Sequence, residues 1–261
     1  MRTATGLTIR NSLRRIPLTT AIGALALFLM ASLAWDAWAA RVHTRPVVDV
    51  AIGSSVCAGE KASPFSNSWQ GLLSAHLKAF DPADTVVNLC GAANTGAMMP
   101  TGFSTPKCAI NAGSTIPDPA HNITAALALH PNAIIMLGGQ GDFILGGAPG
   151  AGGLCTPNTV AALEYDIRTI VKAAAAAGVP FYMSSAGPSN SFDSSRLASA
   201  AAVNRWMRST YPTIYLNTAG VLDDGSGGLK AIYGGPGSHP NNAGHAAIFG
   251  VIQLSSLYKI R

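Results

Sequence analysis

The sequence of 261 residues is 48% apolar and only 11% charged, so it can bury a sizeable core and is neither a charge-rich disordered chain nor a solvated coiled coil. Its formal net charge of +5 is concentrated near the start, at Arg2, Arg10, Arg14 and Arg15. Beyond residue 39, thirteen basic and eleven acidic side chains nearly balance, and this does not argue for nucleic-acid binding.

An uncharged stretch follows these arginines, from residue 17 to residue 35. The small-x-small pattern at 37–39 suits an export peptidase, so we predict a signal peptide that is cleaved after Ala39. An uncleaved signal anchor stays open, because nineteen residues at about 1.5 Å each span nearly the hydrocarbon core of a bilayer. Either alternative places residues 40–261 outside a membrane, secreted or in the cell envelope. Membrane contact is expected only through the N-terminal segment, and only if that segment stays uncleaved.

Short apolar runs alternate with helical patterns along residues 40–261, which we expect to form one domain. In chain order, the patterns predict a strand at 47–52, a helix at 69–80, a strand at 85–89, a loop at 96–119, a helix at 122–130, a strand at 133–137, a loop at 146–157, a helix at 158–177, a strand at 179–184, a helix at 194–209, a strand at 213–217, a loop at 223–238 and a helix at 242–258. This alternation predicts an α/β fold: a three-layer α/β/α, flavodoxin-like sandwich with a central parallel sheet of about five strands.

Four cysteines follow the leader, at positions 57, 90, 108 and 155. An even number in an exported chain is compatible with two disulfides, for which three pairings are possible, and four free thiols are the alternative. The spacing matches no metal-binding pattern, so we expect neither a metal nor a cofactor.

Two segments carry side chains that suit nucleophilic catalysis at the carboxyl edge of the sheet. Ser55 follows the first predicted strand, at a turn into a helix that would expose its hydroxyl and free its amide. His239 precedes Pro240, which favours an extended backbone and projects the imidazole from its loop as a general base. We expect His245, on the helix that follows, to pack or cap rather than to catalyse.

Two further segments could stabilise negative charge. Gly91 follows the second predicted strand, where the backbone can approach a ligand and offer its N–H. Gln140 lies in a glycine-rich turn after the third predicted strand, and its side-chain amide can donate to a developing oxyanion.

In this order, the four segments resemble the SGNH (GDSL-type) hydrolase family over nearly all of residues 47–257. The resemblance implies that Ser55 is the nucleophile and His239 the base. It implies an oxyanion hole made of the amides of Ser55 and Gly91 and the side chain of Gln140, with Gly96 as the alternative to Gly91.

The sequence departs from the family pattern three residues before the histidine. An aspartate usually stands there and orients the imidazole, whereas this chain has Pro236. A main-chain carbonyl could replace it, or a carboxylate from a neighbouring loop, with Asp142, Asp223 and Asp224 as candidates.

The resemblance implies an exported serine esterase or lipase acting on carboxylic esters, with acyl lipids or acylated envelope polysaccharides as expected substrates. The glycine-rich loops at 96–119 and 144–157 would then shape an acyl pocket. Two alternatives remain open: an acyltransferase that uses the same site, and a catalytically weak or inactive protein that binds acyl chains or glycans at the cell surface.

Overall fold

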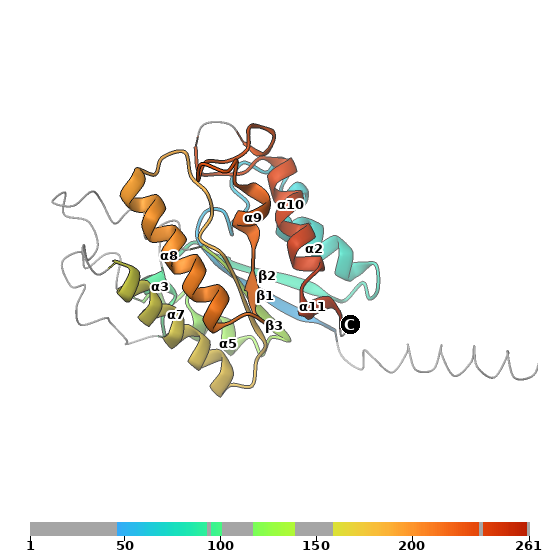
Figure 1. Cartoon of the computed structure of the whole chain (residues 1–261). Coiled ribbons are helices and arrows are strands. Elements are labelled where there is room, and N and C mark those ends of the chain that lie inside the picture. The colour runs from blue at the N-terminus through green and yellow to red at the C-terminus, as the bar shows by residue number, and fades with distance from the viewer. Residues whose placement is uncertain (1–45, 93–94, 101–116, 139–158, 235–236, 260–261) are drawn as a thin grey trace, which may run out of the picture. The chain divides into compact units, whose positions relative to one another are not determined.

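The structure is a computed structural model that describes residues 46–92, 95–100, 117–138, 159–234 and 237–259 (Figure 1). Residues 46–261 form one compact unit. The predicted leader lies outside the described residues, and so do Cys108, Asp142 and Cys155. Within the described ranges, no helix is both long enough and apolar enough to cross a membrane.

A five-stranded parallel sheet forms the centre of the unit, in the order β2-β1-β3-β4-β5 (Figure 1). Its strands are β1 (Val48–Gly53), β2 (Thr85–Cys90), β3 (Ala133–Leu137), β4 (Phe181–Ser184) and β5 (Tyr215–Leu216). The helices of eight or more residues are α2 (Trp69–Lys78), α7 (Thr159–Ala176), α8 (Ser194–Thr210) and α10 (Asn242–Gln253). The predicted α/β sandwich with about five parallel strands is therefore confirmed.

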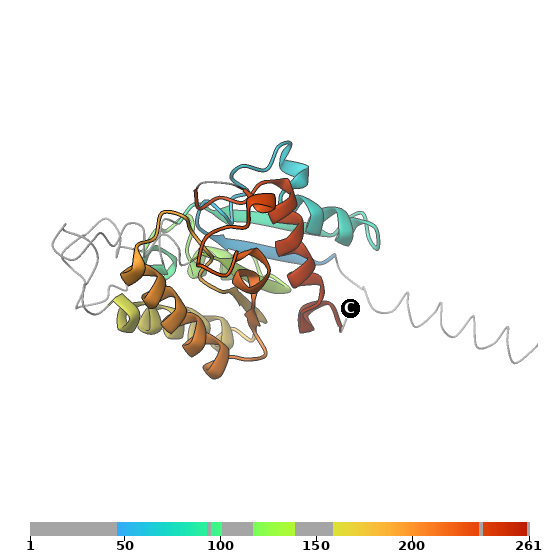
Figure 2. The same cartoon turned by 45° about the horizontal axis from the view of Figure 1, so that its top comes forward.

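The alternating side chains of the strands explain the two helical layers. Ile52 and Met136 belong to a core cluster on one face, with side chains of α7 and α8. Ala51 and Ile135, one residue away, belong to a second cluster with side chains of α2 and α10. Figures 1 and 2 show these two helix pairs on opposite faces of the sheet.

Several short elements were not predicted. They are the helices α3 (Thr95–Met98), α9 (Thr218–Leu222) and α11 (Ser256–Lys259), and the 3₁₀ turns η1 (Phe65–Asn67) and η3 (Ala231–Tyr233). The helix predicted at 122–130 is present as the shorter α5 (Ile123–Ala128). The predicted last helix is wrong as one piece, because α10 ends at Gln253 and α11 begins at Ser256. The hydroxyl of Ser255 donates to the carbonyl of Ile252 at 2.6 Å, a local side-chain bond that competes with helix continuation.

The carboxyl ends of the central strands meet at one edge of the sheet. Gly53 is paired in register with both Cys90 and Leu137, so the segments after β1, β2 and β3 start side by side. Gly53 has φ +144°, and a Cβ atom there would overlap the carbonyl oxygen of Leu137. Only glycine allows this close approach, which places the residues after β1 against the end of β3.

Candidate active site

The nucleophile turn, residues 54–61, follows β1 directly. It consists of successive turns and not of the predicted helix start, since α2 begins only at Trp69. The amides of Ala58 and Glu60 donate to the carbonyls of Ser54 and Ser55 at 2.9 and 3.1 Å. The amide of Ser55 donates to no acceptor among the described residues, so it is free to bind a substrate oxygen.

A disulfide between Cys57 and Cys90 fastens the nucleophile turn to the end of β2. The carbonyl of Cys57 also accepts hydrogen bonds from Trp69 Nε1 at 3.0 Å and from Gln70 Nε2 at 2.5 Å, both on α2. The structure thus selects one disulfide from the pairings that the sequence left open. It fixes the backbone two residues from the Ser55 hydroxyl.

The base loop, residues 237–241, brings His239 to this turn. Nε2 of His239 lies 2.7 Å from Oγ of Ser55, although the two residues are 184 positions apart. The amide of Asn190, after β4, donates to the carbonyl of Gly237 at 3.2 Å, and the amide of Asn241 donates to Tyr233 at 2.7 Å. The structure therefore brings the predicted nucleophile and the predicted base together at the carboxyl edge of the sheet.

The aspartates proposed to orient His239 are engaged elsewhere. Oδ1 of Asp223 accepts the amides of Gly225 and Gly227, and Oδ1 of Asp224 accepts the amide and the hydroxyl of Ser226. Both carboxylates therefore stabilise their own loop and not the imidazole. Pro236 and the third candidate, Asp142, lie outside the described residues.

A carboxylate that the sequence analysis did not consider lies beside His239 instead. Oε2 of Glu60 is 3.3 Å from Nε2 of His239. Glu60 is the single acidic residue of the nucleophile turn, five positions after Ser55, and this was the only signal in the sequence. An isolated glutamate in a turn gives no hint of a contact with a residue so distant along the chain.

His245 is fully buried and supports the turn, in line with the packing role expected for it. Its Nε2 donates to the carbonyl of Glu60 at 3.0 Å, while its Nδ1 has no partner among the described residues. Burial lowers the pKa of His245, the Glu60 carbonyl opposes this, and the neighbouring His239 adds to it. The lowered pKa favours the neutral imidazole, which joins α10 to the nucleophile turn.

The predicted oxyanion donors differ in their surroundings. The amide of Gly91 donates to the carbonyl of Gly53 at 2.8 Å, so a substrate oxygen would have to share it. Gly96, the alternative, is buried in α3. Gln140 lies outside the described residues. The oxyanion roles of Gly91 and Gln140 stay predictions, and the free amide of Ser55 is the donor that the geometry offers directly.

A further histidine, His121, lies near Gly91. Nδ1 of His121 is 2.8 Å from Oδ2 of Asp118, and this hydrogen bond lowers the pKa of Asp118. A Cβ atom at Gly91 would lie 3.1 Å from the His121 ring, so this imidazole covers the end of β2. Among the described residues, no three His, Cys, Asp or Glu side chains are grouped to hold a metal ion.

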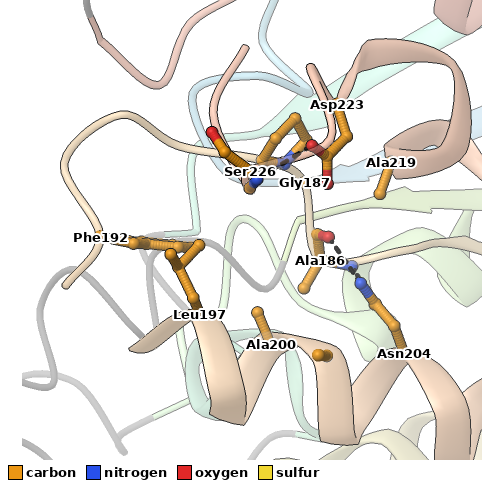
Figure 3. A pocket seen from close by; sticks show the side chains of 12 residues that line it. Ala186, Gly187, Phe192, Leu197, Ala200, Asn204, Ala219, Asp223 and Ser226 are labelled. Atoms are coloured by element: carbon orange, nitrogen blue, oxygen red, sulfur yellow. Dashed lines mark hydrogen bonds between the residues drawn. The ribbon is translucent and has the colours of Figure 1, made fainter. Parts of the chain in front are cut away.

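A pocket of about 260 Å³ opens beyond β4, between α8 and α9 (Figure 3). Phe192, Leu197 and Ala200 line one side of it, opposite Ala219 and Asp223. Both side-chain amide atoms of Asn204 bind the backbone of Ala186, at 2.8 and 3.0 Å. Since these polar atoms are engaged, the pocket offers mainly apolar contacts.

The model of the GDSL-like lipase/acylhydrolase family matches residues 51–247. No curated protein matches the chain.

Three solved structures illustrate the similarity of fold. The crystal structure of TesA is 17% identical, with a TM-score of 0.57, over 82% of this chain and 99% of that one. The acetyl xylan esterase AlAXEase is 11% identical, with a TM-score of 0.55, over 79% and 98%. A member of the lipolytic protein G-D-S-L family from Veillonella parvula is 11% identical, with a TM-score of 0.54, over 81% and 99%.

Proposed function

Because the chain belongs to the GDSL-like lipase/acylhydrolase family, we propose that it is an exported serine esterase or lipase that hydrolyses carboxylic esters through Ser55 and His239. The observation that carries this proposal is the 2.7 Å contact between Oγ of Ser55 and Nε2 of His239. A serine hydroxyl in hydrogen-bond contact with an imidazole nitrogen is the arrangement that activates a serine as a nucleophile.

The proposed reaction has two halves. Oγ of Ser55 attacks the ester carbonyl carbon while its proton passes to Nε2 of His239, and the amide of Ser55 donates to the carbonyl oxygen as it becomes negative. The bond to the alcohol oxygen then breaks, and that oxygen takes the proton from Nε2. Water attacks the acyl-serine, gives a proton to Nε2, and releases the carboxylic acid as Ser55 regains its hydrogen.

Export rests on two observations. The predicted signal segment precedes residue 40, and the Cys57–Cys90 disulfide suits an oxidising compartment outside the cytoplasm. We therefore assign the protein to the cell envelope or the medium.

The pocket beyond β4 supports an ester with an aliphatic group. Neighbouring strands lie about 4.8 Å apart, and β4 is two strands from β1, so the pocket opens roughly 10 Å or more along the edge from Ser55. A pocket of about 260 Å³ exceeds the roughly 150 Å³ that accommodates benzene. We propose that it holds the aliphatic part of an acyl lipid or of an acylated glycan.

A fluorophosphonate probe tests the nucleophile. We expect the purified protein to be labelled, and Ser55→Ala to be unlabelled and at least about 10³-fold slower on p-nitrophenyl butyrate. Ser54→Ala is the matched control, since that buried hydroxyl has no partner among the described residues, and it should label normally. A folded wild type without labelling or turnover would overturn the proposal and favour the acyl-binding alternative.

A panel of p-nitrophenyl esters of rising acyl length tests the pocket. Ala201 lines it from α8, so Ala201→Phe should lower kcat/KM for long esters several-fold and leave the acetate unchanged. Ala198→Phe, at another exposed alanine of α8, is the control. An identical chain-length profile in both variants would remove the pocket from the proposal.

A further inference from the structure

The imidazole nitrogen that meets the nucleophile also meets a carboxylate. Nε2 of His239 lies 2.7 Å from Oγ of Ser55 and 3.3 Å from Oε2 of Glu60. On the other side of the ring, Nδ1 has no hydrogen-bond partner among the described residues. Among the described residues, the negative charge beside the base therefore comes from the nucleophile turn and not from the base loop.

The backbone of Glu60 is held at both of its polar groups. Its amide donates to the carbonyl of Ser55 at 3.1 Å, and its carbonyl accepts Nε2 of His245 at 3.0 Å. The Glu60 side chain therefore extends from a backbone that is hydrogen-bonded to Ser55 on one side and to α10 on the other.

The residues on both sides of Glu60 have left-handed backbone conformations. Gly59 has φ +82° and Lys61 has φ +70°, which is uncommon for a lysine. Unfavourable conformations of this kind persist where the surrounding structure enforces them, and they gather at functional sites. Here the two conformations turn the chain so that Glu60 faces the base loop.

Among the described residues, His239 is the ionisable partner of the Glu60 carboxylate. The Glu60 side chain is 49% exposed and the His239 side chain 26%, so the pair is only partly screened by water. A further ionisable group beside this pair is His245, and burial lowers its pKa, which favours its neutral form. Asp223 and Asp224 stabilise their own loop.

We propose that Glu60 is a positioning residue that stabilises the protonated imidazole of His239 from the Nε2 side, in place of the carboxylate that Pro236 leaves out. This inference rests on the proposed hydrolase function. When His239 takes the proton of Ser55, the new Nε2–H lies between the serine oxygen and the Glu60 carboxylate. Attraction to that carboxylate favours the proton transfer and holds the ring in place until the alcohol leaves.

Kinetics of Glu60→Gln test the proposal. We expect kcat on p-nitrophenyl butyrate to fall about 10-fold with KM within about twofold of wild type, because the charge acts on the chemical step. Glu60→Asp should recover part of the loss. Salt at about 1 M should slow the wild type and leave Glu60→Gln unchanged. Glu164→Gln, an acidic residue on α7 paired with Arg168, is the control and should match wild type.

Imidazole ¹⁵N spectra give a readout that needs no turnover. In Glu60→Gln, the Nε2 signal of His239 should shift, because a carboxylate 3.3 Å from that nitrogen is removed, and in Glu164→Gln it should stay in place. If the wild type neither labels nor turns over but this signal moves, the hydrolase proposal fails and the Glu60 contact stands. An active Glu60→Gln with normal kcat, salt response and spectrum would overturn the inference.

Discussion

The two halves of the candidate site are held in very different ways. The nucleophile turn is fixed by a disulfide, by two side chains of α2 and by its own backbone hydrogen bonds. The base loop is held mainly at its ends, through Gly237 and Asn241, and the described contacts of the His239 ring are those to Ser55 and Glu60. The firmly held nucleophile turn therefore positions the more weakly held base loop.

The largest expected change in stability concerns a buried carboxylate outside both halves, that of Asp166. Burial raises the pKa of Asp166 on α7 to about 7, although the hydroxyl of Thr95 donates to it at 3.1 Å and opposes the shift. The folded state therefore binds this proton more tightly than the unfolded state, where the pKa has its ordinary value of 3.8.

The stability that Asp166 contributes is fully present below about pH 4 and declines as the pH rises to about 7, by roughly 4 kcal/mol in total. We expect Asp166→Asn to remove this decline and to exceed the wild type in free energy of unfolding at pH 8. Urea unfolding at pH 5 and pH 8 measures both. If the free energy of unfolding fell equally in both proteins between pH 5 and pH 8, the charged Asp166 carboxylate would have to be stabilised by a partner in the folded state.

The second largest effect is expected from removal of the Cys57–Cys90 disulfide, which should destabilise the nucleophile turn. The disulfide joins residues 33 positions apart, for which loss of the cross-link costs about 3–4 kcal/mol. We expect Cys57→Ala/Cys90→Ala to lose that much free energy of unfolding and to fall in kcat, since Cys57 is two residues from Ser55. A loss below about 1 kcal/mol would show that Trp69 and Gln70 hold the turn without it.

The smallest expected effect concerns the base loop. Asn241 caps α10 through Gly244 and donates to the carbonyl of Ile232 at 3.1 Å. Asn241→Ala should cost about 1 kcal/mol of stability and lower kcat on p-nitrophenyl acetate several-fold, because it loosens His239. Asp193→Ala removes the cap of α8 and should cost similar stability at unchanged kcat. If kcat were the same in both variants, the position of His239 would not depend on Asn241, and the base loop would not be the weakly held half of the site.

Local sequence patterns were sufficient for the sheet, since buried apolar runs such as 133–137 alternate with long helical periods. Short elements escaped, because α9 spans only five residues and has too little periodicity to detect. The pairing of Cys57 with Cys90 could not be derived from spacing, because it depends on which strands become neighbours.

The residues of the candidate site also separate into those that the sequence predicts and those that it does not. Ser55 and His239 each stand in a recognisable local pattern, so they could be named before their contact was known. Glu60 has no such pattern, and its importance follows only from the distance to His239. The engagement of the Gly91 amide by Gly53 was equally hidden, because it depends on the register of β1 and β2.

The 184 positions between Ser55 and His239 also bear on how the protein is made. A ribosome produces the serine early and the imidazole only when most of the domain has been translated. Any fragment released before residue 239 carries the nucleophile without its base. Nascent and truncated chains therefore lack the contact between Ser55 and His239, which forms only when the polypeptide is nearly complete.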